Sequence, residues 1–150
     1  MERNKKLAVV GLIALIAIIA TSFMFLRTSR GPAGTVVGFY SAIGRGDFEG
    51  AAEYLPAEER DLMLAEFENV PEEEIEMMEE MMEALNIDVN ILDETIDEGT
   101  GTATVKAEIT TSIDFMGIEE TETETITFEL EKENGNWVIV DTDQDPMAGF

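Results

Sequence analysis

The sequence predicts an α+β fold: three to four helices packed on a four-stranded antiparallel meander, preceded by an N-terminal transmembrane helix. Three observations lead to this prediction. Residues 7–26 form an uncharged apolar run, residues 35–85 carry apolar side chains at helical spacing, and apolar and polar side chains alternate from residue 88 onward. Helices followed by strands in this order imply helices on one face of an antiparallel sheet.

The apolar run LAVVGLIALIAIIATSFMFL, residues 7–26, is interpreted as an uncleaved single-pass membrane anchor. A helix of this length rises about 30 Å, the thickness of a bilayer's hydrocarbon core, whereas the apolar stretch of a signal peptide usually has about 7–15 residues. Positive charge is slightly greater before the run, from Arg3, Lys5 and Lys6, than after it. This bias favours a cytoplasmic N-terminus and an extracytoplasmic domain. The expected divisions are a cytoplasmic tip and anchor at 1–30, a linker at 31–34, the α+β domain at 35–145 and a tail at 146–150.

The composition excludes several classes of function. Cysteine and histidine are absent, which removes disulfides, thiolate nucleophiles, Ser-His-Asp chemistry and zinc sites that need either residue. Residues 31–150 contain 32 acidic residues against 4 basic ones, a formal charge of −28. Such a surface repels phosphate backbones and anionic headgroups, so nucleic acid is not expected as a partner. Solubility or adaptation to salty surroundings explains this charge without a partner, and a cation or a basic partner is the alternative.

Four helical segments are expected at the start of the domain. The first begins at Thr35, which is placed to cap it, and carries apolar side chains at helical spacing. Asp47 can cap a short second helix that Pro56 ends. A third helix follows over 57–70, and Pro71 opens a fourth, whose leading glutamates suit a helix N-terminus.

The glycine-rich stretch SAIGRGDFEG, residues 41–50, lies between the first two predicted helices. Its glycines do not match the phosphate-binding spacing G-x-G-x-x-G, and no strand precedes them. Arg45, Gly46 and Asp47 spell an adhesion tripeptide, but Asp47 already has a capping position. We interpret the stretch as a flexible turn between helices.

Two patterns resemble metal sites, and neither predicts one. Met77 and Met81 lie one helical turn apart and could bind Cu(I) or form a pliable apolar surface. Without cysteine or histidine, we expect these methionines to pack in the core. Asp141, Asp143 and Asp145 imitate the start of a calcium loop, but a proline follows where the loop requires glycine. No metal and no cofactor are therefore predicted.

Alternating apolar and polar side chains predict four strands joined by glycine-containing turns. In the second strand, alanine, valine and isoleucine at odd positions alternate with threonine, lysine and glutamate. This pattern indicates one buried face and one solvated face. Strands joined by such short turns form an antiparallel meander. The expected strands cover residues 89–97, 102–115, 121–131 and 137–141.

Two segments resemble parts of nuclear-transport-factor-like domains, particularly small membrane-anchored or lipoprotein members of unknown function. VVGFYSAIGRGDFEGAAEYL, residues 36–55, is similar to their opening helix pair, and ENGNWVIVD, residues 133–141, is similar to their closing hairpin. In layout the resemblance covers roughly residues 34–141. The residues that carry it are Phe39, Tyr40, Gly46, Asp47, Ala51, Ala52, Gly135 and Trp137.

The resemblance implies a curved sheet that wraps the first helix into a cone, often with an apolar pocket inside. Some members of the family are isomerases, cyclases or dehydratases, and many others only bind ligands or partners. Enzymes of this kind commonly place Asp or His in the pocket, and this chain has no His. Its inward strand positions are apolar except for Thr111, Glu122 and Glu124, and we expect the two glutamates at the exposed end of their strand.

We therefore expect a membrane-anchored, extracytoplasmic domain that binds a small apolar ligand or a protein partner and has no catalytic residues. The candidate site is the mouth of the cone, where Tyr40, Tyr54, Phe128 and Trp137 supply large apolar or amphipathic surfaces. Phe128 sits amid the buried face of a strand and is also expected in the core. The alternatives are a carboxylate-based isomerase or cyclase of the same fold and a cation-binding surface protein. A homodimer that forms through the sheet is a further alternative.

Overall fold

The computed structural model describes residues 30–115 and 117–144. The chain divides into two units, Met1–Arg30 and Gly31–Phe150, and only the second is described below. The predicted anchor at 7–26 and the predicted tail lie outside the described residues. Within the described part of the chain, none of the helices has both the length and the apolar character needed to cross a membrane.

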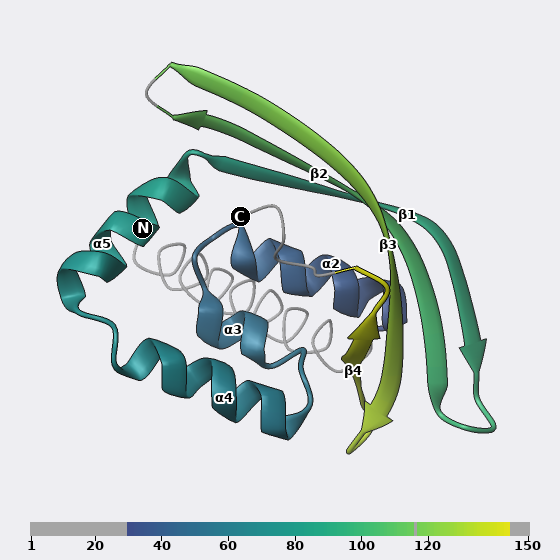
Figure 1. Ribbon diagram of the computed structural model, residues 1–150. Coiled ribbons are helices and arrows are strands. Elements are labelled where there is room, and N and C mark those ends of the chain that lie inside the picture. The colour runs from purple at the N-terminus through teal and green to yellow at the C-terminus, as the bar shows by residue number, and fades with distance from the viewer. Residues whose placement is uncertain (1–29, 116, 145–150) are drawn as a thin grey trace, which may run out of the picture. The chain divides into compact units, whose positions relative to one another are not determined.

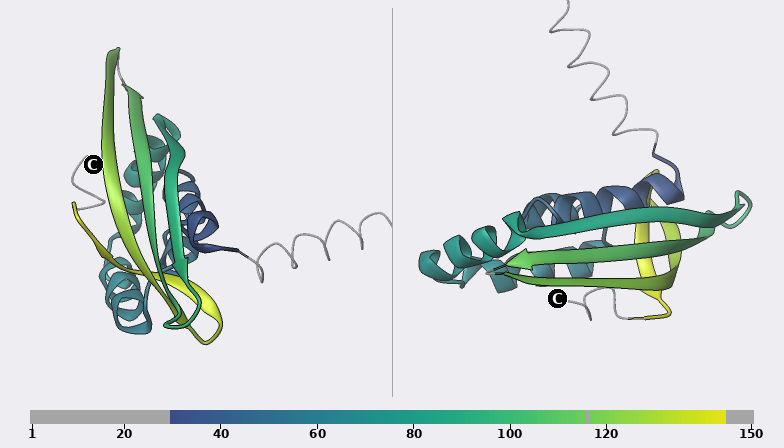
Figure 2. Two further views of the ribbon diagram at one scale, coloured as in Figure 1. Left: turned by 90° about the vertical axis from the view of Figure 1, so that its right-hand side faces the viewer. Right: turned by 90° about the horizontal axis from the view of Figure 1, so that it is seen from above.

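The domain is α+β, with four helices followed by a four-stranded antiparallel meander, as predicted. The sheet has the strand order β1-β2-β3-β4, so each strand pairs with its neighbours in sequence (Figure 1). Figure 2 shows the helices on one side of the long, bent sheet. The elements are α2 (Pro32–Ile43), α3 (Phe48–Ala52), α4 (Ala57–Glu68), α5 (Glu72–Glu83), β1 (Leu85–Asp97), β2 (Thr102–Phe115), β3 (Ile118–Glu133) and β4 (Asn136–Thr142).

The core lies between α2 and the concave face of the sheet. Alternate residues of β2 and β3 face α2, and the pairing places Val105 opposite Phe128 and Ala107 opposite Ile126, all four buried. This confirms the predicted alternation of buried and solvated positions. The side chains that α2 contributes to the core are Val36, Phe39, Tyr40, Ala42 and Ile43.

Helix α2 begins earlier than the sequence predicts. Pro32 occupies its first turn, where the missing N–H of proline costs no hydrogen bond, so residues 32–34 of the expected linker are helical. Thr35 is buried inside the helix, and its hydroxyl donates to the Gly31 carbonyl at 3.2 Å. The predicted capping role of Thr35 is therefore wrong.

A bulge in β1 ties the start of α2 to the sheet. The pairing of β1 with β2 shifts between Ile91 and Asp93, and Leu92 is left 48% exposed. Beyond the bulge Glu94 pairs with Val105 and shares its concave face. The Glu94 carboxylate accepts a hydrogen bond from the Ala33 backbone N–H at 2.7 Å, satisfying a free donor at the helix N-terminus.

The glycine-rich stretch is a turn between α2 and α3, as predicted. Gly46 has φ +68°, a left-handed conformation that glycine adopts without strain. Asp47 then caps α3, because its carboxylate accepts from the Gly50 N–H at 2.9 Å.

Helices α4 and α5 pack more loosely than α2. No residue of α4 is buried, and α4 packs mainly against α3, where the Phe48 and Phe67 rings stack with centroids 4.5 Å apart. Helix α5 packs against β1 and buries Met82, whereas Met77 and Met81 are 64% and 49% exposed. The expectation that Met77 and Met81 lie in the core is wrong, because both side chains remain exposed on α5.

Candidate functional site

The structure brings two of the four predicted site residues into direct contact. Tyr40 and Phe128 are 1% and 0% exposed, and their rings meet edge to face with centroids 6.0 Å apart. Both lie in the core between α2 and the sheet, as expected for Phe128. Whether either of them meets a ligand stays a prediction.

The other two predicted residues lie near β4. The backbone carbonyl of Tyr54, whose side chain is half-buried, accepts from the Ile139 N–H at 2.8 Å. Trp137 is 9% exposed, and the Lys132 ammonium lies 5.1 Å from its ring centroid. Their predicted binding role likewise stays a prediction.

Apolar side chains occupy the buried part of the concave face of the sheet. In the described residues no Asp, Glu, Lys or Arg side chain is buried, and Thr35 is a buried polar residue with a hydrogen-bond partner. Glu122 is exposed and Glu124 is half-buried, which agrees with their expected place toward the open end of β3. The carboxylates, lysines and arginines of the described residues therefore lie where water reaches them.

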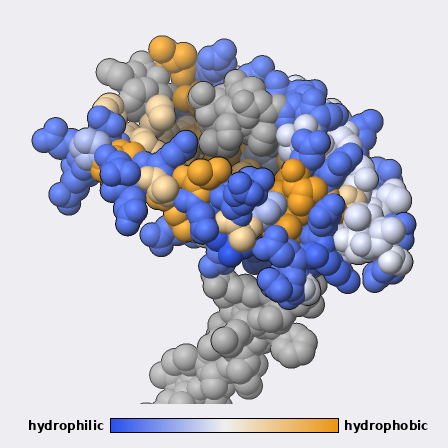
Figure 3. Space-filling model, turned by 60° about the horizontal axis from the view of Figure 1, so that its bottom comes forward, coloured by the Kyte–Doolittle hydropathy of each residue, from blue (hydrophilic) through white to orange (hydrophobic). Residues whose placement is uncertain are grey.

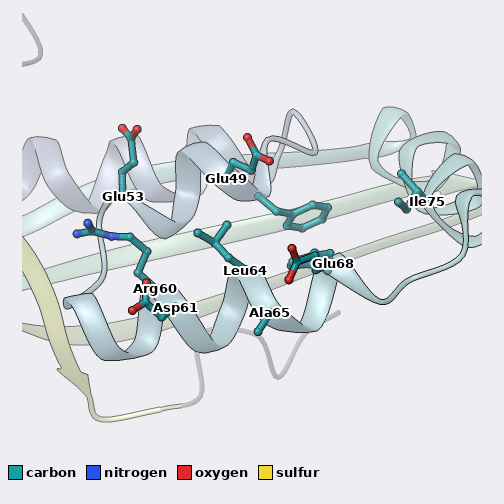
Figure 4. Close-up of a pocket in the computed structure, with 10 residues that line it drawn as sticks. Glu49, Glu53, Arg60, Asp61, Leu64, Ala65, Glu68 and Ile75 are labelled. Carbon is teal, nitrogen blue, oxygen red and sulfur yellow. The ribbon is translucent and has the colours of Figure 1, made fainter.

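A groove that the sequence did not predict lies between α3, α4 and the start of α5. It has a volume of about 890 Å³ and is open to solvent (Figure 4). Its apolar lining comes from all three helices: Phe48 from α3, Leu64 and Phe67 from α4, and Ile75 from α5. In Figure 4, Leu64 projects from α4 toward α3, and Ile75 lies at the far end.

Charged side chains surround this apolar floor. Four exposed carboxylates line the groove. Glu49 and Glu53 lie on the α3 side, and Asp61 and Glu68 belong to α4. Arg60 also lines it. The rim thus carries four carboxylates against one guanidinium, so its field favours a positively charged ligand.

Arg60 has a structural role at this groove. Its guanidinium donates to the carbonyl oxygens of Ala52, at 3.3 Å, and Leu55, at 3.1 Å. Ala52 is the last residue of α3 and Leu55 lies in the turn that follows, and the Ala52 carbonyl also accepts from the Leu55 N–H at 3.1 Å. Arg60 therefore holds α4 to α3 and shapes one end of the groove.

No family model matches the chain, and no curated protein matches it. Solved structures do resemble it. A SEC-C motif containing protein from Rhodopseudomonas palustris has a TM-score of 0.53 and 16% identity over 77% of this chain and 82% of that one. A function-unknown protein from Mycobacterium tuberculosis has a TM-score of 0.50 and 12% identity over 86% of this chain and 77% of that one.

A third solved structure is an NTF-2 like protein of unknown function from Shewanella oneidensis, with a TM-score of 0.49 and 17% identity over 71% of this chain and 93% of that one. What the first two of these proteins share with this chain is the fold. The α+β architecture that the sequence resemblance implies is confirmed, since helices come first and a curved meander then folds around α2. At sequence identities of 12–17%, the structural similarity says nothing about an activity of this chain.

Proposed function

We propose that the α+β domain is a non-catalytic binding domain and that its ligand occupies the groove between α3, α4 and α5. The observation that carries this proposal is the groove itself, an apolar floor of about 890 Å³ at the surface of a strongly charged domain. Ligand-binding pockets commonly have volumes of about 300–1,000 Å³ and combine an apolar lining with a few polar groups. The groove has both properties.

The placement of the carboxylates supports binding rather than catalysis. Catalytic acids and bases usually depend on burial or on close charge partners that shift their pKa values. The groove carboxylates Glu49, Glu53, Asp61 and Glu68 are all exposed. Turnover of a carbonyl substrate, lost when Glu124 on the concave side of β3 is replaced by Gln, would support the isomerase or cyclase alternative and contradict this proposal.

The second part of the proposal is that a single-pass anchor holds the α+β domain on the outer side of the cell membrane. Its support is the uncharged apolar run at 7–26 and the excess of positive charge that precedes it. A reporter fused after Phe150 should be extracytoplasmic, and the mature chain should retain residues 7–26. A reporter found in the cytoplasm, or a mature chain beginning near Thr35, would contradict this placement.

Binding in the groove can be tested with a neutral probe of apolar sites. The chain lacks cysteine, so an Ala65→Cys variant can be labelled at the groove alone with an environment-sensitive fluorophore. The labelled full chain, held in phosphatidylcholine nanodiscs, is titrated with N-acetyl-phenylalaninamide. We expect a saturable response in the millimolar range, because one aromatic side chain provides a dissociation constant of roughly 1 mM at best.

Two leucines of α4 provide matched variants for this experiment. Leu64 lines the groove, whereas Leu62 is 62% exposed and does not line it. Leu64→Glu should abolish the saturable response, and Leu62→Glu should leave it unchanged although both add the same charge. A linear response, or the same response in both variants, would show that the groove does not bind apolar ligands.

A further inference from the structure

Helix α4 is packed on one side only. It carries Leu62, Leu64 and Phe67 within three turns, yet none of its residues is buried. Apolar side chains on a soluble surface are ordinary when scattered, but contiguous apolar patches mark interaction sites. Figure 3, which brings the lower side of Figure 1 forward, shows apolar patches set among hydrophilic side chains. On the side of α4 that faces the groove, Leu64 and Phe67 are only half-buried and offer an apolar surface that a partner could cover.

The negative charge of the groove rim favours a positively charged partner. Four exposed carboxylates line the groove, and the one guanidinium among them is directed at the carbonyls of Ala52 and Leu55. A second copy of the chain brings the same excess of negative charge and is repelled. An anionic membrane surface is repelled for the same reason. A cationic partner is attracted.

The open, elongated shape of the groove suits a helix better than a small molecule. Small-molecule sites bury about 70–90% of the ligand surface, and a groove open to solvent buries less of a small ligand than an enclosed pocket does. The α4 lining runs from Arg60 to Glu68, a length of about 12 Å at 1.5 Å per residue. An open apolar groove between helices is the surface that receives the apolar face of an amphipathic helix.

We propose that the groove between α3, α4 and α5 receives a cationic amphipathic helix of a partner protein. This inference rests on the proposed function and names the class of ligand. The apolar stripe of the partner helix covers Leu64, Phe67 and Ile75. Its lysine and arginine side chains reach the carboxylates on either side, Glu53 from the α3 side and Asp61 from α4.

The inference is tested with a labelled synthetic peptide of about 18 residues that carries leucine at i, i+3, i+4 and i+7 and lysine elsewhere. Two control peptides replace either every lysine by glutamate or every leucine by alanine. Fluorescence anisotropy with the full chain in phosphatidylcholine nanodiscs should report saturable binding of the first peptide alone. Its affinity should fall as KCl is raised, because salt screens exposed charges.

Two double variants with the same change in net charge locate the binding site. Glu53→Gln with Asp61→Asn neutralises the rim, whereas Asp88→Asn with Glu119→Gln neutralises two exposed carboxylates on the opposite face of the sheet. The rim variant should weaken binding roughly tenfold, as expected for two exposed ion pairs, and the sheet variant less than about twofold.

The outcomes separate this inference from the proposed function. Equal weakening by both double variants, or equal binding of the alanine control peptide, would mean non-specific attraction between opposite charges and would overturn the inference. Saturable binding of N-acetyl-phenylalaninamide without any peptide binding would overturn the inference and leave the proposed function standing. Failure of both probes would overturn both.

Discussion

Asp47 and Gly50 form an interdependent pair at the start of α3. One oxygen of the Asp47 carboxylate accepts from the Gly50 N–H at 2.9 Å. A Cβ atom at position 50 would lie 2.3 Å from the other oxygen, Oδ2. Glycine is needed here because the capping carboxylate occupies the space of a side chain.

This contact predicts that the effect of Gly50→Ala on the free energy of unfolding depends on the residue at position 47 and changes sign when Asp47 is replaced. Gly50→Ala should lower the free energy of unfolding in the natural sequence, because the new Cβ displaces the cap. Asp47→Ala alone should cost about 1 kcal/mol. In that background Gly50→Ala should stabilise by about 0.5–1 kcal/mol, since alanine is the better helix former. Urea unfolding of the four proteins gives the double-mutant cycle, and additive effects would contradict the proposed contact.

Phe128 is predicted to contribute chiefly to stability. It is 0% exposed and packs edge to face on Tyr40, so Phe128→Ala should cost about 3–5 kcal/mol through lost burial and the cavity left behind. Ile118 lies on the same strand and is 65% exposed, so Ile118→Ala should change stability by about 0.5 kcal/mol or less. Chemical denaturation compares the two. Similar small losses would mean that Phe128 does not belong to the packed core.

At the scale of elements, the bulge at Leu92 determines how α2 attaches to the sheet. It resets the alternation of β1, and Glu94 on the concave face then meets the first turn of α2. This one hydrogen bond joins residues 61 positions apart in sequence.

Loss of this contact should destabilise the domain measurably. Glu94→Ala removes an anionic acceptor at a helix N-terminus, which typically contributes about 0.3–1 kcal/mol. Glu94→Gln keeps an acceptor and should lose less. Asp88→Ala, on the opposite face of the same strand, should be close to neutral. Thermal unfolding compares the three variants, and an equal effect of Glu94→Ala and Asp88→Ala would contradict the capping role.

The sequence predicted the elements with strong local signals and missed those that tertiary contacts decide. Alternation from Ala103 to Ile109 determined β2, and the Asp47 cap followed from local spacing. Strand β1 begins at Leu85 rather than residue 89, because its first residues pair with the far end of β2. No local pattern indicates that pairing, because the partner residues lie more than a strand length away in sequence.

The candidate site was harder to predict than the fold. The groove combines three short helices, and the placement of α4 against α3 depends on Arg60, which donates to the Ala52 carbonyl. The large aromatics pointed instead to the mouth of the cone, yet Tyr40 and Phe128 are fully enclosed. One feature of the sequence did indicate the groove. Helix α4 carries Leu64 and Phe67, but its apolar stripe is too narrow for the helix to be buried.

At the scale of the whole molecule, the negative charge opposes compactness. Residues 31–150 carry a formal charge of −28 on a small domain, and their mutual repulsion is stronger in the folded state because the charges lie closer together. This contribution is not specific to any contact, so it should respond to ionic strength alone.

The melting temperature should therefore rise with added monovalent salt. Screening shortens the range of the repulsion from about 10 Å at 0.1 M to about 3 Å at 1 M ionic strength. KCl and NaCl should have the same effect, because the mechanism does not depend on the cation. Differential scanning calorimetry in both salts measures it. A flat or falling melting temperature would contradict the charge argument, and a difference between the salts would indicate specific ion binding.

The packing of α2 against β4 has a consequence for synthesis. Helix α2 is the first helix of the domain to be made, and strand β4, which adds Trp137 and Ile139 to the same core, is made last. At about 5–20 residues per second, roughly 100 residues of intervening chain take about 5–20 s to emerge from a ribosome. During this interval Val36, Phe39 and Tyr40 have no finished core to enter. The nascent domain therefore passes through a period in which its most apolar helix is exposed, and a chaperone has its best opportunity to bind there.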